Sequence, residues 1–232
     1  MNIYHATLET CGGATGVVVV IDVLRAFTTA PFAFDAGAIE ILPVGTLEEA
    51  LELKKRSPGS LIMGHDASRD GFDYGNSPSA LNGVNLHGKR LIQRTGAGTQ
   101  GLVLNRNAQS LLAASFVCAS ATVKLIKELS PEAVVFVSTT DHGEDRACAD
   151  YLEALLMGQQ PDSTPYLDRL NRAGQLHIDL ATNTGGTTEE QLAEFRADII
   201  CAAQIDRFDF ALLVEPGREQ NGEPMIMKKK RC

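Results

Sequence analysis

Short hydrophobic runs alternate along the chain with segments whose apolar residues recur every three or four positions. Residues 17–21 are apolar and β-branched throughout, which is typical of a strand buried on both faces of a sheet. By the same criterion the pattern predicts further strands at residues 39–44, 61–64, 90–95, 111–117, 134–138 and 210–215.

The helical pattern predicts helices over residues 46–56, 121–129, 145–157 and 188–205. Thr46 stands three residues before Glu49, which indicates a capping box, and Thr188 opens the last helix. Strands that alternate with helices favour crossover connections. The sequence therefore predicts an α/β fold, a layered α/β/α sandwich with a mostly parallel or mixed sheet.

The chain is expected to form a single domain over residues 1–232. A polar stretch at residues 159–186 contains prolines and glycines, and it could separate a smaller C-terminal subdomain from the main body.

Polar residues gather directly after the predicted strands. They are Asp22 and Arg25, then Asp73, Asn76 and Ser77, then Thr95 to Thr99, then Cys118 and Ser120, and finally Asp141 to Asp145. In open α/β sheets, ligands bind beyond the carboxyl ends of the strands. These positions are therefore the candidate functional site.

Asp22 ends the most apolar strand, where an isolated charge is costly and needs a partner. Arg25 follows three residues later, at the start of a helix, within reach of an anion bound there. Two interpretations stay open, an internal Asp22–Arg25 ion pair that fixes the turn and a role for both residues in a site.

Two glycine-containing turns are candidate anion sites. Arg94 and Thr95 lead into a turn in which Gly96 and Gly98 alternate with Ala97 and Thr99, and its backbone N–H groups could bind phosphate or sulfonate oxygens. An ordinary strand-to-helix turn explains this segment equally well. Ser77 precedes Pro78 and is expected to cap a helix, which would leave N–H groups for a ligand.

Carboxylates crowd at residues 141–145. Glu144 and Asp145 would lie in the first turn of a helix, where the helix dipole favours acidic residues. The alternative is ligation of magnesium, which uses one or two carboxylates together with water and substrate phosphate. His142 in the same segment is a candidate proton donor.

Charge and cysteine content limit the classes of function. The chain has 21 basic and 29 acidic residues, a net charge of −8, which is opposite to that of a general nucleic-acid binder. We expect the basic run at residues 228–231 to be a frayed tail. No apolar run approaches the ~18 residues of a membrane span, no signal peptide is apparent, and five cysteines without a CxxC motif fit a cytoplasmic protein.

One cysteine motif matches a phosphatase pattern by spacing alone. Cys201 and Arg207 have the C-x5-R spacing of cysteine phosphatases, but the segment between them lacks glycine and continues a helix. We therefore do not expect a phosphate-binding loop there.

Several motifs in one order resemble the 2-phosphosulfolactate phosphatase family. They are residues 20–26, 41–45, 71–78, the turn at 95–99, residues 115–120, and Glu144-Asp145 followed by Cys148-Ala149, with a weaker match at 198–201. The family turn commonly contains Thr-Asn-Gly-Thr, where this chain has Gly96 to Thr99, and Cys118 stands where the family often has asparagine.

The resemblance implies a magnesium-dependent phosphatase with an α/β fold that releases phosphate from 2-phospho-3-sulfolactate, a step toward coenzyme M in methanogens. Asp22, Arg25 and Asp145 are the expected catalytic residues, and Asp22, Glu144 and Asp145 the expected metal ligands. The expected substrate-binding residues are Asp73, Asn76, Ser77, Arg94, Thr95, Gly96, Gly98, Thr99, Cys118 and Ser120.

The nucleophile is either metal-activated water or Asp22. The expected partner is a small phosphorylated anion rather than nucleic acid or a membrane, and a homodimer stays open. The competing hypothesis is a non-catalytic protein that binds or senses a small anion on the same scaffold without a metal.

Overall fold

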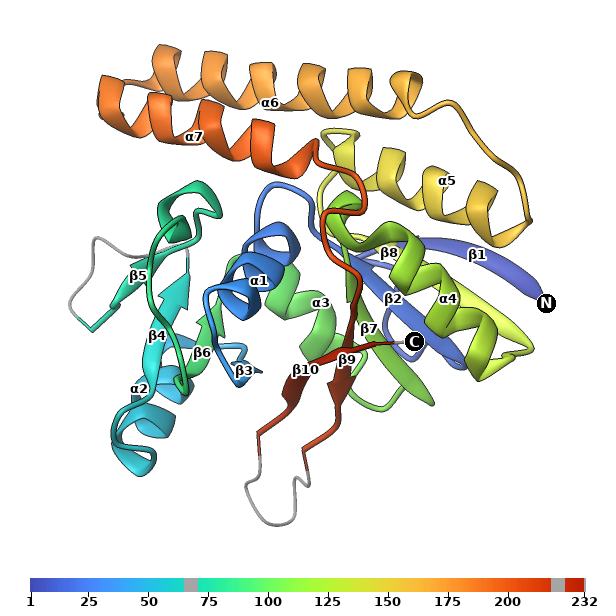
Figure 1. Cartoon of the computed structure of the whole chain (residues 1–232), viewed down its shortest axis with the longest axis horizontal. Coiled ribbons are helices and arrows are strands. Elements are labelled where there is room, and N and C mark those ends of the chain that lie inside the picture. The colour runs from blue at the N-terminus through green and yellow to red at the C-terminus, as the bar shows by residue number, and fades with distance from the viewer. Residues whose placement is uncertain (65–70, 218–223, 232) are drawn as a thin grey trace.

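The computed structural model describes residues 1–64, 71–217 and 224–231. The described residues form one ten-stranded sheet in the order β1-β8-β2-β7-β9-β10-β3-β6-β4-β5 (Figure 1). Its strands are β1 (Asn2–Thr7), β2 (Val17–Ile21), β3 (Glu40–Pro43), β4 (Leu61–Gly64), β5 (Tyr74–Gly75), β6 (Arg90–Arg94), β7 (Ser110–Ala114), β8 (Ala133–Ser138), β9 (Ala211–Glu215) and β10 (Ile226–Lys230).

The sheet consists of two parallel groups of strands joined by an antiparallel pair. Strands β1, β8, β2 and β7 run parallel to one another, and so do β3, β6, β4 and β5. Between the groups, β9 pairs antiparallel with both β7 and β10, and β10 meets β3 only at Met227 and Ile41. The predicted mixed α/β architecture is confirmed.

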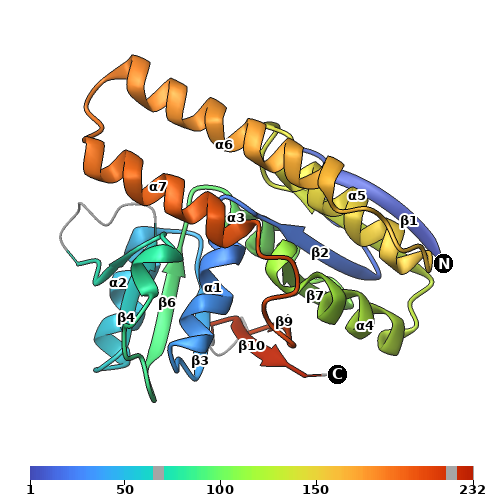
Figure 2. The ribbon, with the colours of Figure 1, turned by 45° about the horizontal axis from the view of Figure 1, so that its top comes forward.

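Helices cover both faces of the sheet (Figures 1 and 2). They are α1 (Ala26–Asp35), α2 (Leu47–Arg56), α3 (Gly98–Leu104), α4 (Ala119–Leu129), α5 (Glu144–Leu156), α6 (Thr164–Thr184) and α7 (Glu189–Ala202), with short 3-10 helices η1 (Ser79–Leu81) and η2 (Phe116–Cys118).

The alternation of side chains along β2 shows how the layers are held. Val18 and Val20 pack on one face in a core with Phe27 of α1 and with strands of both parallel groups. Val17 and Val19 pack on the other face, against α4 and α5. A third, smaller core lies between α2 and the second group of strands. Burial of both faces explains why this strand is apolar at every position.

The predicted helix caps are present. Thr46 Oγ1 accepts a hydrogen bond from Glu49 N at 3.1 Å, while the Glu49 carboxylate turns to Gly45 N instead of to Thr46. Thr188 and Gln191 form a complete capping box at the start of α7.

Two segments differ from the sequence-based expectation. Within the polar stretch at 159–186, residues 164–184 form the long helix α6, which packs on α5 and α7 (Figure 2). The basic run expected as a frayed tail lies largely in β10, where Lys228 Nζ contacts Glu215 Oε2 at 2.7 Å. Pairing with β9 holds residues that look unstructured by composition alone.

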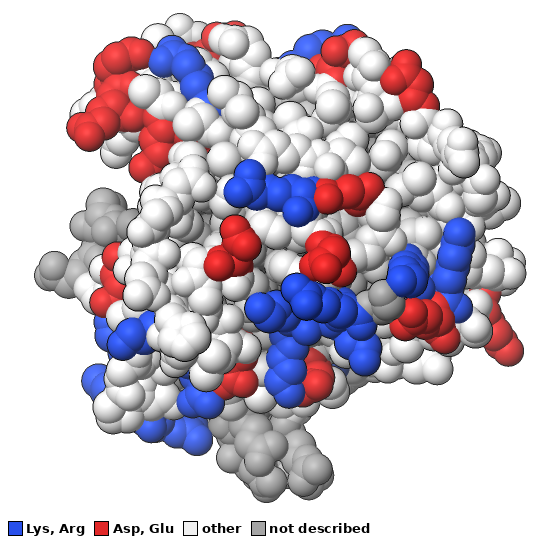
Figure 3. Space-filling view, in the orientation of Figure 1, with Lys and Arg blue, Asp and Glu red and all other residues white. Residues whose placement is uncertain are grey.

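The surface shows mixed charge. On the face drawn in Figure 3, basic side chains near β9 and β10 are interleaved with acidic ones, and acidic side chains gather where α6 and α7 join. Among the described helices, none is both long and apolar enough to cross a membrane.

Candidate active site

Asp22 comes directly after β2, and its side chain is almost completely buried. Its Oδ1 accepts a hydrogen bond of 2.9 Å from the N–H of Ala26, the first residue of α1. Its Oδ2 lies against the backbone of Gly98. The strand-to-helix junction thus fixes this carboxylate at the end of β2.

Asp145 joins the segments that follow two neighbouring strands. Its Oδ1 accepts a hydrogen bond of 2.8 Å from Val23 N, next to Asp22. Its Oδ2 accepts from Thr139 N and Thr139 Oγ1, each at 3.0 Å, and from Thr140 N at 2.9 Å. The oxygens of Asp145 are therefore used largely to hold the loops after β2 and β8 together.

Glu144 is the first residue of α5 and is fully buried. Its Oε1 accepts a hydrogen bond of 3.0 Å from Thr140 Oγ1. Its Oε2 is buried and has no hydrogen-bond partner among the described residues. His177 of α6 places Nε2 3.9 Å from Oε1, which is longer than a hydrogen bond but close enough for an electrostatic interaction.

These three carboxylates influence one another's protonation. Burial, followed by the charge of Glu144, raises the pKa of Asp22 to about 6. Burial and the charges of Asp22 and Glu144 raise the pKa of Asp145 well above its ordinary value. Burial would also raise the pKa of Glu144, but nearby His177 and the donors around it outweigh burial and lower that pKa. Ionised carboxylates therefore disfavour one another in this cluster, and a cation would make their joint ionisation favourable.

The turn between β6 and α3 is brought against Asp22. Thr95 and Thr99 hold it by reciprocal bonds, in which Thr99 Oγ1 accepts from Thr95 N at 3.0 Å and Thr95 Oγ1 from Thr99 N at 3.1 Å. A Cβ atom on Gly98 would lie 2.6 Å from Asp22 Oδ2. Gly98 is therefore needed for close approach, whereas Gly96 is exposed and has open space around it.

Arg25 pairs with α7 rather than with Asp22. Its Nη1 donates a hydrogen bond of 2.7 Å to Asp198 Oδ2, and its guanidinium lies 5.2 Å from the ring centroid of Phe195. Asp198 is fully buried, and its Oδ1 accepts from Ser77 Oγ at 2.7 Å and from Ser79 N at 3.0 Å. This ion pair fixes Arg25 beside the carboxylate cluster and ties α7 to the segment after β5.

Other predicted residues have structural partners of their own. Asp73 Oδ2 binds Lys54 Nζ at 2.6 Å and Ile62 N at 2.7 Å. Ser120 bonds through its backbone N–H and its hydroxyl to the carboxylate of Asp206. Cys118 is fully buried, and burial raises the pKa of its thiol. These contacts explain the three residues without a ligand.

The remaining predicted residues lie close to the end of a strand. Arg94 is the last residue of β6 and is partly buried. Asn76 follows β5 and is buried, and its Oδ1 has no hydrogen-bond partner among the described residues. Ser77 Oγ accepts from Ala80 N at 3.2 Å, but the segment that follows is only the short 3-10 helix η1, whose N-cap is Pro78, and not the helix that Ser77 was expected to cap.

Sequence reasoning missed two residues of the site. Asp198 gave a signal, because it is an acidic residue flanked by Ala197, Ile199 and Ile200 in a helix. His177 gave none, because a single polar residue in α6 looks like part of a solvated helix face. Cys201 is buried, and burial raises its pKa, which is the opposite of what a nucleophilic thiol needs.

The described residues contain no group of three or more His, Cys, Asp or Glu side chains arranged to hold a metal ion. Asp145 accepts several hydrogen bonds and Asp22 accepts fewer, so the unpartnered Oε2 of Glu144 is the oxygen best suited to a cation, with Asp22 as the second carboxylate. Magnesium usually takes one or two protein carboxylates, so the donor set fits this ion.

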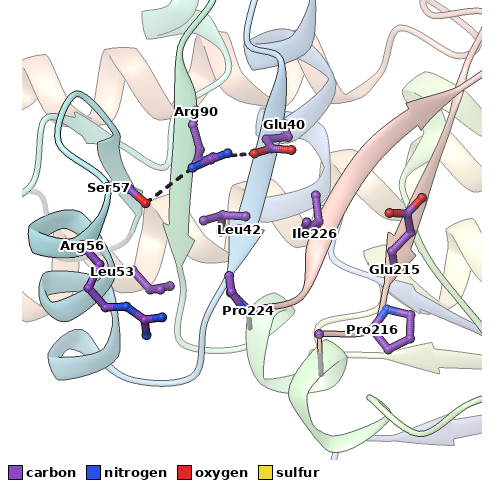
Figure 4. A pocket seen from close by; sticks show the side chains of 11 residues that line it. Glu40, Leu42, Leu53, Arg56, Ser57, Arg90, Glu215, Pro216, Pro224 and Ile226 are labelled. Carbon is purple, nitrogen blue, oxygen red and sulfur yellow. Dashed lines mark hydrogen bonds and ion pairs between the residues drawn. The ribbon is translucent and has the colours of Figure 1, made fainter. Parts of the chain in front are cut away.

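A separate cavity of about 400 Å³ lies between α2 and the β9–β10 pair (Figure 4). Leu42, Leu53 and Ile226 contribute apolar surface to it, and Arg90 contacts both Glu40 and Ser57. It shares no residue with the carboxylate cluster. We place the chemistry at the cluster, because buried carboxylates with raised pKa values mark a candidate reactive site.

The fold and the cluster define an α/β protein with a buried acidic centre at the converging ends of β2, β6 and β8. The chain matches the family model described as 2-phosphosulpholactate phosphatase over residues 4–217, and it belongs to that family.

Its relatives include proteins named probable 2-phosphosulfolactate phosphatase. That of Bacillus subtilis (strain 168) is 37% identical over 60% of this chain and 64% of its own length. The protein of Carboxydothermus hydrogenoformans is 40% identical over 62% of this chain and 61% of its own length. The protein of Prochlorococcus marinus (strain SARG) is 32% identical over 88% of this chain and 89% of its own length. The chain thus spans somewhat less than two thirds of the first two relatives and most of the third.

Proposed function

We propose that the protein is a magnesium-dependent phosphomonoester hydrolase that releases phosphate from 2-phospho-3-sulfolactate or a similar small phosphorylated acid. The observation that carries the proposal is the buried cluster of Asp22, Glu144 and Asp145, in a chain that belongs to this family. Such a cluster repels an anionic substrate unless a cation accompanies it.

Asp22 and Glu144 would hold the magnesium ion, and Asp145 would keep the loops that carry them in place. When bound, magnesium supplies positive charge that offsets the phosphate and favours ionisation of water. Arg25, fixed by Asp198, and those N–H groups of the turn at 95–99 that do not bond within it would orient the anionic groups of the substrate. Phosphoryl transfer requires mainly such positioning and charge neutralisation.

Phosphate release from 2-phospho-3-sulfolactate, measured with and without magnesium, tests the proposal. We expect turnover that depends on magnesium and falls at least ~10²-fold in Asp22→Asn while the protein stays folded. The matched control is Asp35→Asn, since Asp35 is an exposed residue at the end of α1 and outside the candidate site. An anion-binding protein would instead bind the substrate without magnesium and release no phosphate, and this result would refute the proposal.

A further inference from the structure

The α6–α7 hairpin adds a histidine to the acidic cluster. His177 faces Glu144, and its ring stands nearly perpendicular to that of His142, with 4.5 Å between centroids. On its other side the ring lies 5.7 Å from that of Phe195, which also contacts the Arg25 guanidinium. The imidazole is thus held between two aromatic neighbours rather than free in solvent.

Two buried polar atoms lie near each other without hydrogen-bond partners, one on an imidazole and one on a carboxylate. His177 Nε2 and Glu144 Oε2 are both buried, and neither has a hydrogen-bond partner among the described residues. A buried polar group that lacks a partner costs roughly 1–3 kcal/mol, so such groups usually serve a bound molecule or water. An unused carboxylate oxygen suits a cation, and an unused imidazole N–H beside it suits an anion.

We propose that His177 is a substrate-binding residue whose Nε2–H donates a hydrogen bond to an oxygen of the phosphoryl group and of the phosphate released from it. The proposal rests on the function proposed above, in which Glu144 belongs to the metal site. A phosphate oxygen beside a cation on Glu144 would satisfy both unpartnered atoms together. His142 and Phe195 hold the ring in place for this contact.

Calorimetric titration with inorganic phosphate at one fixed pH, with and without magnesium, tests this role. His177→Phe keeps a ring against His142 and Phe195 but removes the donor, and we expect it to weaken phosphate binding roughly tenfold or more. His177→Gln restores an N–H donor and should recover affinity to within about threefold of wild type. His87→Gln changes an exposed histidine outside the site and should bind phosphate as wild type does.

A second titration, with magnesium alone, distinguishes a contact between His177 and phosphate from an effect of His177 on metal binding by Glu144. Magnesium alone should still bind His177→Phe, with an affinity within a few-fold of wild type, because the proposed contact is to phosphate and His177 acts on Glu144 only through its charge. In steady-state assays the same variant should raise KM for the phosphorylated substrate, with rescue by His177→Gln. Circular dichroism and thermal melting verify that each variant is folded.

The outcomes are distinct. Unchanged phosphate affinity in folded His177→Phe overturns the role of His177 and leaves the phosphatase function intact if wild type hydrolyses its substrate. Loss of magnesium binding in His177→Phe also overturns it, in favour of a role in orienting Glu144. If wild type neither binds phosphate with magnesium nor hydrolyses the substrate, the function and the role of His177 both fail.

Discussion

Asp145 and Glu144 are adjacent in sequence, yet their carboxylates have different surroundings. Asp145 accepts hydrogen bonds from the backbone of Val23, Thr139 and Thr140. Glu144 keeps one buried oxygen without a partner. Asp145 therefore holds two loops together, and of the two adjacent residues Glu144 has the carboxylate oxygen that is available to a cation.

Gly98 provides a test of the contact between two strand ends. In Gly98→Ala the new Cβ atom would lie 2.6 Å from Asp22 Oδ2 and 2.8 Å from Ala26 Cβ, so Asp22 or the turn must move. We expect turnover to fall at least ~10²-fold, because small displacements of catalytic groups are costly.

Gly96→Ala is the matched control, since nothing lies within 4 Å of a Cβ built there. It should retain activity close to that of wild type in the same assay. Equal activity of the two variants would show that the approach of the turn to Asp22 does not matter for turnover.

For single residues, the sequence predicted where a side chain lies in the fold better than it predicted which residue that side chain binds. Asp22 could be predicted to be buried because it ends an entirely apolar strand, and it is. The partner of Arg25 could not be predicted, because Asp198 lies far along the chain and reaches it only through tertiary packing. Asp73, Cys118 and Ser120 lie near the ends of strands, but contacts within the protein account for Asp73 and Ser120 and burial accounts for Cys118, and their roles toward substrate stay predictions.

At the scale of elements, the α6–α7 hairpin acts as one wall of the site. It carries Asp198 to Arg25 and His177 to Glu144, and α6 lies along α5 (Figure 2). Displacing the hairpin would therefore disturb both the arginine and the acidic cluster.

Breaking the Arg25–Asp198 ion pair should weaken the packing of the α6–α7 hairpin against the site. We expect Asp198→Asn to lower the free energy of unfolding by about 2–4 kcal/mol, because a largely buried guanidinium loses its charged partner. Urea unfolding measures this, and KM should rise in parallel.

Glu194→Gln is its control, because Glu194 is half-exposed and lies 3.8 Å from Arg25. Glu194→Gln should lower the free energy of unfolding by less than ~0.5 kcal/mol. Equal losses of stability in the two variants would contradict a special role for the buried pair.

A second contact of α6 should depend on pH. Asp150 of α5 accepts bonds from Arg169 of α6 at 2.6 Å and from Arg146 at 2.7 Å. Burial acts to raise the pKa of Asp150, but the two arginines outweigh it and lower that pKa. Because the folded-state pKa lies below the unfolded one, the pair stabilises the protein above pH ~4 and loses this effect in more acidic solution.

Asp150→Asn should therefore reduce stability by less than about 1 kcal/mol near neutral pH, since the groups are partly exposed. Urea unfolding of both proteins should show the difference shrinking as the pH falls below ~4. A difference that does not change with pH would mean that shape rather than charge is responsible.

Prediction of elements succeeded where periodicity was strong and failed where tertiary contacts decide. The apolar run at 17–21 and the capped helix after Thr46 appear as expected. Helix α6 was missed because its exposed polar residues conceal a narrow buried stripe that includes Leu170, Ala173 and Ile178. Strand β10 was missed because Lys228 and Lys229 look like a tail, and only pairing with β9 makes them a strand.

At the scale of the whole molecule, the joined sheet brings distant segments together. Asp22 follows β2 in one parallel group of strands, and Gly98 follows β6 in the other, yet the two residues are in contact. The sequence indicated the polar ends of the strands but not the order of the strands, which depends on long-range pairing through β9 and β10. The site therefore requires both parallel groups of strands and the β9–β10 pair that joins them.

A cation at the acidic cluster should stabilise the whole fold, because it relieves repulsion that exists only when the three carboxylates are brought together. A ligand that binds only the folded state adds about 2.7 kcal/mol at one hundred times its Kd, which corresponds to a rise in Tm of roughly 5–10 °C for a chain of this size. Thermal melting of chelator-treated protein with added magnesium measures the shift, with potassium at equal ionic strength as the control. Glu144→Gln should abolish most of the shift, whereas Asp35→Asn, at an exposed residue outside the site, should leave it unchanged. A full shift in Glu144→Gln would place the ion away from this cluster and remove the basis for assigning it to Asp22 and Glu144.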